Sequence, residues 1–263
     1  MTHIKLSDAV QIVVRPDSAI QFGIDATRSG VLEIDPAFIA AITSILLHLR
    51  EPKPVAGVVD KLSAAGLGTV AALSLVEDLL AFGVVRETAT APVLLYGHGT
   101  LVDATSALLE AAGFNPRTRI NDENSREFFQ RPASHILVIN RLAHTRNLAP
   151  LLAECAPTYL SAALIDSRGL IGPGRRDGVG PCLLCVDLHR SDIDPHWHAL
   201  VSQHPNGPTH ADPIAEAATA ARLAALVSAD SWLPGEVEEV DPHLGAYRKS
   251  HLAPHPRCPL CWG

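Results

Sequence analysis

The stretch that decides the fold is Val93-Leu94-Leu95-Tyr96-Gly97-His98-Gly99, a short apolar run that leads directly into a glycine turn. A helical pattern follows from about Thr100 to Ala112. A buried strand, a glycine turn and a helix together have the local shape of a nucleotide-binding βα unit. The dinucleotide fingerprint needs a third glycine, and Val102 stands at that position. Gly97 and Gly99 therefore form a degenerate nucleotide turn, and the alternative is a tight turn that binds no ligand.

Further strands and helices alternate downstream of this unit. Apolar runs predict strands at Thr118–Asn121, Ile136–Ile139 and Tyr159–Ile165. This alternation indicates an α/β protein with a parallel, Rossmann-like sheet. We therefore predict that residues 92–263 form one degenerate Rossmann-like domain.

The chain changes character after Gly169. The glycines between Gly172 and Gly180 stand among Pro173, Arg175 and Arg176, which predicts an exposed loop. Asp212-Pro213 is a good helix start for an Ala-rich helix that runs to about Ala229. Beyond that helix we expect an irregular, proline-rich tail.

Residues 1–88 have the pattern of a separate small domain. Three β-like runs are followed by three helical segments and a possible wing strand: Val10–Val14, Ile20–Ile24, Val31–Ile34, then Pro36–Leu49, Pro54–Ala65 and a helix from Thr69, then Val84-Val85. The order predicts a winged-helix (α+β) domain. A linker at Thr88–Pro92 is expected to join it to the rest of the chain.

Four of the five cysteines form two CxxC pairs, Cys182/Cys185 and Cys258/Cys261. Each pair can present two thiolates from one tight turn, and two pairs complete an all-sulfur tetrahedron that suits Zn²⁺. A closed shell leaves no open position for catalysis, so the zinc is expected to be structural and to fasten the tail. A redox role would instead use one CxxC at a helix start.

Two further sets of residues stay outside this pattern. We expect Cys155 to be a buried filler residue. Five of the histidines between the cysteine pairs could replace a cysteine or build a second site: His189, His196, His198, His204 and His210. Their spacing fits no known motif, and surface positions are the simpler interpretation.

Composition and charge exclude several functions. The net charge of -7 argues against general binding of nucleic acid or of anionic lipid. The longest apolar runs, such as Ala40–Leu49, are too short to span a bilayer. We see no signal peptide and expect a cytoplasmic protein that does not bind a membrane.

Two longer motifs surround the cysteines: Gly180-Pro181-Cys182-Leu183-Leu184-Cys185-Val186-Asp187-Leu188-His189-Arg190-Ser191-Asp192 and His255-Pro256-Arg257-Cys258-Pro259-Leu260-Cys261-Trp262. With the degenerate glycine turn, they resemble the ThiF-like proteins, relatives of ubiquitin-activating enzymes. The resemblance is closer to a subgroup from clusters that make azole-containing ribosomal peptides, and it covers nearly the whole chain.

This resemblance implies a function and partners. In the subgroup, a winged-helix peptide recognition element precedes the ThiF-like part, and residues 1–88 would be that element. It binds the leader of a precursor peptide and presents the peptide to a YcaO-type cyclodehydratase, which uses ATP to form azolines. ThiF-like proteins also commonly pair, which implies a homodimer; the small residues of Pro213–Ala229 would permit close helix approach, although an interior helix has the same composition.

The sequence departs from the adenylating members of the family. Those members have an Asp after the third strand for Mg·ATP, whereas Asn140 stands here. Loss of that carboxylate removes a hard oxygen ligand for magnesium. The segment after the second strand offers Asp122 and Arg126 only loosely. We therefore expect ATP not to be turned over.

We predict that the peptide binds by strand addition, because a short sheet leaves one edge of backbone groups unpaired. The expected site comprises the strand Val31, Leu32, Glu33 and Ile34 and the helical side chains Leu73, Val76 and Leu80. The alternative is that these side chains only close the core of a small domain. Arg28, just before the strand, could meet an acidic anchor.

Two other functions remain as alternatives. The first is an active ThiF-type adenylating enzyme, which Val102 and Asn140 disfavour. The second is a winged-helix regulator that binds DNA. Residues 69–80 contain no Lys or Arg but carry Glu77 and Asp78, whereas readout of bases and phosphates needs donors there.

Overall fold

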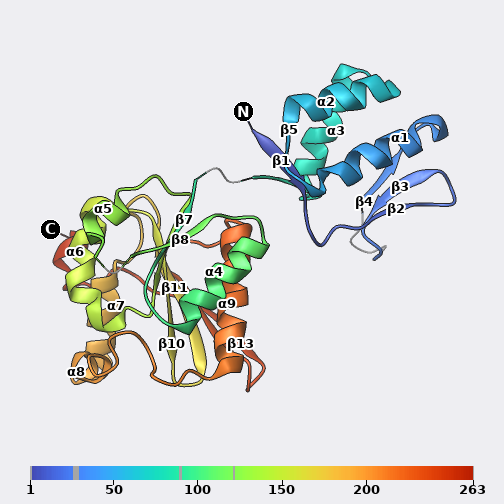
Figure 1. The fold of residues 1–263 in the computed structure, drawn as a ribbon. Helices are drawn as coiled ribbons and strands as arrows, with labels where there is room; N and C mark the ends of the chain where they lie inside the picture. Colours follow the sequence, from blue (N-terminus) through green and yellow to red (C-terminus); the bar gives the residue numbers. More distant parts are fainter. Residues whose placement is uncertain (1, 26–29, 89–90, 121, 263) are drawn as a thin grey trace. The chain divides into compact units, whose positions relative to one another are not determined.

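The computed structural model describes residues 2–25, 30–88, 91–120 and 122–262 (Figure 1). The chain divides into two compact units, Met1–Thr88 and Ala89–Gly263. The expected linker falls partly on residues 89–90, and Arg28 falls on residues 26–29; both lie outside the described residues. In the described residues, no helix has the length and apolar character needed to cross a bilayer.

The N-terminal unit packs three helices on two small antiparallel sheets. Its helices are α1 (Pro36–Leu47), α2 (Val55–Leu62) and α3 (Thr69–Ala81). One sheet has the order β2-β3-β4, with β2 (Ile12–Val14), β3 (Ala19–Phe22) and β4 (Gly30–Glu33). The other has the order β5-β1-β6, with β5 (Lys53–Pro54), β1 (His3–Leu6) and β6 (Val85–Glu87). Asp35 caps α1 as expected, because its carboxylate accepts from the N–H of Ala37 at 2.9 Å.

The second sheet of this unit was not predicted. β1 has four residues and β5 only two, one of them a proline, so neither has the length of a recognisable strand pattern. β1 is nevertheless a core strand, since Ile4 and Leu6 are both buried. Its position between β5 and β6 becomes evident only when residues far apart in the chain are brought together.

The C-terminal unit is built on a mixed seven-stranded sheet of order β13-β12-β11-β10-β9-β7-β8. The strands are β7 (Val93–Tyr96), β8 (Pro116–Thr118), β9 (His135–Ile139), β10 (Tyr159–Ile165), β11 (Arg168–Arg175), β12 (Glu236–Asp241) and β13 (Ala246–His251). The first four are parallel to one another, and the last three extend the sheet in antiparallel fashion. The predicted parallel sheet is therefore only part of the sheet.

Helices cover both faces of this sheet, as Figure 1 shows. On one face lie α4 (Thr100–Ala111) and α9 (Pro213–Ser228), and on the other α5 (Ser125–Phe129), α6 (Thr145–Cys155) and α7 (Leu183–Ile193). The remaining helices, α8 (Trp197–Val201) and α10 (Pro259–Trp262), are short. On α9, Ala215, Ala220 and Ala224 pack toward α4 and the sheet, whereas Ala217, Ala221 and Ala225 are exposed.

The exposed loop predicted after Gly169 is wrong, because most of this segment is the half-buried strand β11. Its glycines are required by close packing. A Cβ on Gly172 would lie 2.1 Å from the carbonyl oxygen of Glu236, and one on Gly174 would lie 2.5 Å from the ring of Trp232. A glycine-rich segment can therefore be a strand when a neighbouring backbone or ring occupies the space of its side chains.

Two other expectations are also corrected. The tail is not irregular throughout, since the β12–β13 hairpin precedes its proline-rich end. The strand expected at Thr118–Asn121 lies earlier, at β8, and Asn121 is outside the described residues. The strand and helix ends predicted around Val93–Gly99 and Asp212-Pro213 are confirmed within one or two residues.

Candidate metal centre and glycine turn

The four paired cysteines converge on one point between α7 and the C-terminal tail. Their sulfur atoms all lie within 4.8 Å of one another. The Sγ atom of Cys182 lies 3.8 Å from that of Cys185 and 3.5 Å from that of Cys258, and Cys185 lies 3.6 Å from Cys261. A tetrahedron with metal–sulfur distances of about 2.3 Å has edges of about 3.8 Å. The four cysteines therefore could hold one metal ion in a closed shell.

Local structure explains how each pair presents its sulfurs. Cys182 is the N-cap residue of α7, and Cys185 lies in the first turn of that helix. Cys258 directly precedes α10, which contains Cys261. Both pairs thus lie at helix starts, the position that we expected for a redox pair. The convergence of all four sulfurs, rather than the local position, distinguishes a metal site from a redox pair.

Donors around the sulfurs suit thiolates. The N–H of His255 donates to Sγ of Cys185 at 3.3 Å, and Nη1 of Arg175 donates to Sγ of Cys261 at 3.4 Å. Four thiolates and one divalent cation leave a net charge of -2, and the Arg175 guanidinium offsets part of it.

Without a metal, the pKa values of two of the thiols are raised. A hydrogen bond with Cys185 and then burial raise the pKa of Cys182, and burial raises the pKa of Cys258 to about 11. Bringing four thiolates together without a cation would be unfavourable, so metal binding must displace protons from these sulfurs. The donor set therefore fits a thiophilic metal ion, whose positive charge would offset the negative charge of the thiolates.

The tail is attached to the unit through this centre. Nε1 of Trp262 donates to the carbonyl of His255 at 2.9 Å, and Nε2 of His255 contacts Asp192 on α7 at 2.8 Å. The segment is short and contains three prolines, so it has few backbone hydrogen bonds of its own. A metal that joins Cys258 and Cys261 to α7 would supply the missing constraint.

The histidine-rich stretch adds no ligand to the four sulfurs. Among the described residues, the four cysteines are the one group of three or more candidate ligands with atoms close enough for a metal. His189 contacts the carbonyl of Ala253 at 3.0 Å instead, and His198 lies 3.4 Å from the buried carboxylate of Asp187. Cys155 is half-buried at the end of α6, 3.7 Å from Arg126.

Packing accounts for the glycine turn without a ligand. A Cβ on Gly97 would lie 2.3 Å from the carbonyl oxygen of Ile139 in β9, so the position admits only glycine. Val102 is buried and lies against the bare backbone of Gly97, where it fills the space that a third glycine would leave. Gly99 has φ of 95° at the N-cap of α4.

A loop of the chain itself covers this turn. Nη1 of Arg141 donates to Oδ1 of Asn206 at 2.7 Å, and a Cβ on Gly99 would lie 4.0 Å from the carbonyl oxygen of Asn206. A Cβ on Gly207 would lie 2.6 Å from the side chain of Asn140. The loop 205–207 thus lies at the carboxyl ends of β7 and β9, which is where open α/β sheets bind ligands.

Asn140 has a structural role at this point. It is buried, its φ is 53°, and its Oδ1 accepts from the N–H of Leu164 at 2.9 Å. An Asn tolerates this left-handed conformation better than most residues. The side chain therefore connects β9 to β10 and has no oxygen directed to a ligand.

Sequence reasoning missed a cationic cluster at the turn. Arg119 and Arg141 both lie over the ring of Tyr96, at 5.3 and 5.4 Å from its centroid. Burial and then the charge of Arg141 lower the pKa of both His98 and His144. The arginines are far apart in sequence and follow different strands, so only the parallel pairing of the sheet could have indicated them.

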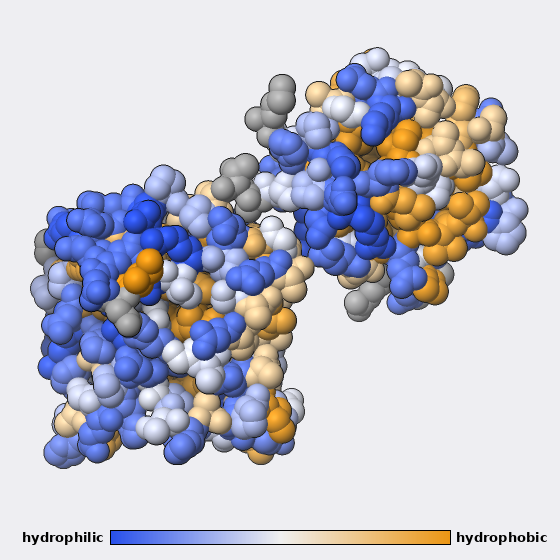
Figure 2. Space-filling view, in the orientation of Figure 1, coloured by the Kyte–Doolittle hydropathy of each residue, from blue (hydrophilic) through white to orange (hydrophobic). Residues whose placement is uncertain are grey.

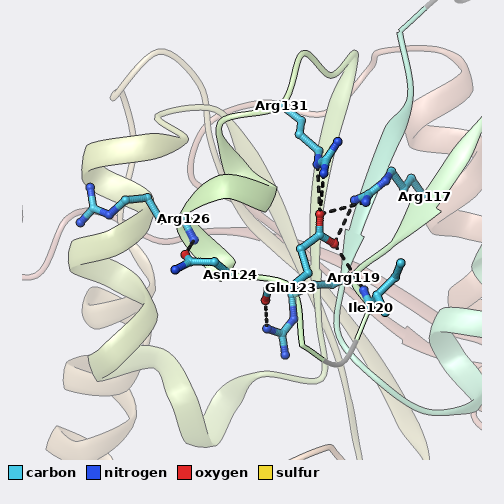
Figure 3. A network of polar contacts seen from close by, with 7 residues as sticks. All are labelled: Arg117, Arg119, Ile120, Glu123, Asn124, Arg126 and Arg131. Atoms are coloured by element: carbon cyan, nitrogen blue, oxygen red, sulfur yellow. Dashed lines mark hydrogen bonds and ion pairs between the residues drawn. The ribbon is translucent and has the colours of Figure 1, made fainter.

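The segment after β8 has a different use from the one expected. Figure 3 shows that the carboxylate of Glu123 contacts Arg117 and Arg131. This carboxylate lies 2.9 Å from both arginines, and the hydrogen bond from Arg117 contributes most to lowering its pKa. Arg126 pairs with Glu154 on α6. This network fixes the β8–α5 connection and leaves Arg126 away from the turn.

The predicted peptide-binding residues divide into exposed and buried groups. β4 is an edge strand of its sheet, and the side chain of Val31 is 47% exposed. On α3, Leu73 is 44% exposed, Leu80 is half-buried, and Val76 is only 3% exposed within the core. Val76 therefore contributes to the core, as the alternative interpretation required, whereas Val31 and Leu73 are accessible.

Comparison with known proteins shows a likeness in fold. No model of a protein family matches the chain, and no curated protein matches it. A heterocyclase in complex with substrate and cofactor is similar over 99% of this chain and 40% of its own, with a TM-score of 0.57 and 14% identity. The heterocyclase TruD is similar over 99% of this chain and 43% of its own, with a TM-score of 0.56 and 14% identity. The chain thus spans about two fifths of the length of these heterocyclases.

Proposed function

We propose that this chain is a leader-peptide-binding partner protein, which presents a ribosomal precursor peptide to a separate YcaO-type cyclodehydratase for azoline formation. The observation that carries the proposal is that 99% of the chain matches two fifths of a heterocyclase. On this proposal, the separate cyclodehydratase supplies the catalytic part. The cysteine and tail motifs, which resemble those of azole-forming clusters, support the same assignment.

We further propose that the chain does not adenylate its peptide. Three features support this. The third glycine is Val102, the expected magnesium ligand is Asn140, and the loop 205–207 lies over the turn. The side chain of Asn140 is committed to Leu164, so it is not available as a magnesium ligand. Arg119 and Arg141 alone could attract phosphates but could not place Mg²⁺.

The N-terminal unit has a surface suited to an apolar peptide. Figure 2 shows extensive apolar surface on the visible face of this unit. Its exposed large apolar side chains are Val13, Val14, Ile24, Val31, Leu47, Val70, Leu73 and Phe82. Exposed apolar side chains at this density favour a binding role. Strand addition to β4 would pair the free edge, and Leu73 would contact the peptide side chains.

A titration of full-length protein with the leader of the neighbouring precursor peptide tests this site. Glu33→Pro on β4 removes a backbone donor of the free edge, whereas the N–H of Leu32 faces β3, and it should weaken binding at least tenfold. Val14→Pro is the matched control, because it removes a donor from the free edge of β2, on the opposite side of the same sheet. It should leave the affinity within about twofold.

The two variants make the result interpretable. Both must retain cooperative thermal unfolding, which shows that the unit is folded. Equal affinity of wild type and a folded Glu33→Pro variant would exclude β4 as the docking edge. Loss of binding in Val14→Pro alone would move the peptide to β2.

We also propose a structural Zn²⁺ at the four cysteines and a homodimer in solution. Ala217, Ala221 and Ala225 of α9 form an exposed row, which would permit close helix approach, and the dimer otherwise rests on the resemblance. Light scattering at micromolar concentration tests it, and a monomer mass would contradict it.

A further inference from the structure

A cavity lies between α7 and the sheet, on the face opposite α4 and α9. Its volume is about 350 Å³, which is within the range of small-molecule sites. Most of its lining is apolar and includes Val138, Leu170, Leu183, Val186 and Val237. The sheet continues through β12 and β13, whereas α7 ends at Ile193, so this helix leaves space over the outer strands.

The charged side chains that line the cavity are all cationic. Arg141, Arg190 and His189 line the cavity, and none of the described lining residues is Asp or Glu. An apolar wall reduces the local dielectric constant, which strengthens the attraction of these groups for an anion. The cavity thus combines an apolar body with a positive potential.

Arg190 has no carboxylate partner within the described part of the chain. Its guanidinium lies 5.3 Å from the ring centroid of Trp197. Burial and then the charge of Arg168 lower the pKa of Arg190. The negative charge of Glu239 raises the pKa of Arg190, but this carboxylate is paired with Arg168 at 3.3 Å. Arg190 is therefore a partly desolvated cation without an ion pair, an arrangement that an added anion would stabilise.

Arg141 contributes a second unsatisfied donor. Its Nη1 is used by Asn206, but its Nε is buried and has no hydrogen-bond partner among the described residues. A buried donor without an acceptor costs about 1–3 kcal/mol. The guanidinium of Arg141 also adds positive charge to the cavity wall.

We propose that this cavity binds a small carboxylate with an apolar body. The carboxylate lies at Arg190, because no carboxylate of the described residues pairs with this cation. The apolar body packs on Val138, Leu183 and Val186. Guanidinium–carboxylate pairing in an apolar wall gives both charge and direction to the contact. The site lies on the opposite face of the sheet from the helix that follows the glycine turn. All of its lining residues belong to the C-terminal unit, whereas the proposed peptide-binding residues belong to the N-terminal unit, so the two proposals are independent.

Calorimetry with 3-phenylpropionate and 3-phenylpropanol tests the inference on the full-length protein. The two probes share one apolar body and differ in the charge. We expect saturable one-to-one binding of the acid and at least tenfold weaker binding of the alcohol. Arg190→Gln should weaken the acid about tenfold and leave the alcohol unchanged.

Two variants serve as controls. Arg248→Gln on β13 makes the same change in net charge outside the lining and leaves Glu239 paired with Arg168, so it should leave acid binding within about twofold. Val237→Phe fills the cavity from β12 and should abolish binding of both probes. Each variant is compared with wild type in thermal unfolding before it is titrated.

The inference is overturned if acid and alcohol bind equally, if neither saturates at millimolar concentration, or if Arg248→Gln weakens the acid as much as Arg190→Gln. Should Arg190→Gln fail to fold, binding by wild type and its loss in a folded Val237→Phe variant decide the matter.

Discussion

Nη1 of Arg141 lies 2.7 Å from Oδ1 of Asn206, across a sequence separation of 65 residues. This hydrogen bond joins the end of β9 to a loop from the second half of the unit. The loop reaches the side of Gly99 and the side chain of Asn140. Protein atoms thus occupy the carboxyl ends of β7 and β9, and several predictions about this turn can be made directly.

Pyrophosphate exchange with candidate peptides should be absent with the wild-type chain. Asn206→Ala should release the loop but should not restore exchange, because Val102 and Asn140 remain. Nucleotide binding, measured by calorimetry, could rise in this variant while exchange stays absent. Mg²⁺-dependent exchange by wild type would contradict the proposal and favour the adenylating alternative.

Gly207→Ala should destabilise the C-terminal unit. Its φ is 91°, and a Cβ there would lie 2.6 Å from Asn140. Gly178→Ala is the matched control, since φ is 77° but nothing lies within 4 Å of its Cβ. The control should cost about 1 kcal/mol from φ alone, and Gly207→Ala about 2 kcal/mol more. Urea unfolding of both variants measures the difference, and equal costs would contradict the close contact.

The four-cysteine site should bind about one zinc ion per chain. Cys258→Ser should lower the metal content and reduce stability by about 2 kcal/mol or more, which is roughly 4–8 °C in Tm. Cys155→Ser is the control and should change neither. Metal analysis of protein purified without added zinc is the measurement. Metal-free protein in which all five thiols titrate freely would refute the site.

Acidification should weaken the unit through His98 and His144. Their pKa values in the folded state are lowered, first by burial and then by Arg141. The unfolded chain therefore takes up protons first, and this part of the stability is present above about pH 6.5 and is lost as the pH falls below it.

The double variant His98→Gln/His144→Gln should remove this contribution. Its free energy of unfolding should change less between pH 7.5 and 6 than that of wild type, because all other groups titrate equally in both proteins. Parallel pH profiles of the two proteins would show that the histidines are not desolvated.

Glu238 should be important for the β11–β13 extension. Its side chain is 3% exposed and meets Arg222 at 2.6 Å and Lys249 at 3.0 Å. Burial opposes its ionisation, but the hydrogen bonds from Arg222, Tyr247 and Lys249 outweigh that effect and lower the pKa of Glu238 to about 2. The stability that it supplies is therefore present above about pH 4.5 and is lost as the pH falls toward 2.

Glu238→Gln should cost on the order of 2 kcal/mol at pH 7, because it leaves the partly buried guanidinium of Arg222 without its carboxylate, whereas Lys249 keeps Glu236. Glu239→Gln, on the same strand but more exposed, should cost less than 1 kcal/mol. Chemical denaturation at pH 7 and pH 3 compares them. A smaller loss for Glu238→Gln than for Glu239→Gln would contradict this assignment.

Local patterns in the sequence determined part of this architecture. The run Val93–Tyr96 and the pair Asp212-Pro213 predicted β7 and the start of α9, because apolar periodicity and capping act between near neighbours. The two CxxC pairs predicted the metal ligands, because their spacing already brings two sulfurs to one turn. Val102 was recognised as a departure from the glycine fingerprint, and Asn140 as a departure from the adenylating proteins that the sequence resembles.

Long-range contacts decided the rest. The glycines of β11 indicated a loop, since the backbone of Glu236 and the ring of Trp232, which replace their side chains, come from distant segments. The loop 205–207 has no local signal that directs it to the glycine turn, and Arg119 and Arg141 meet at Tyr96 only through parallel pairing of β7, β8 and β9. Sequence specified elements whose energetics are local, whereas packing between distant segments decided how the glycine turn is filled and where Arg190 is left without a partner.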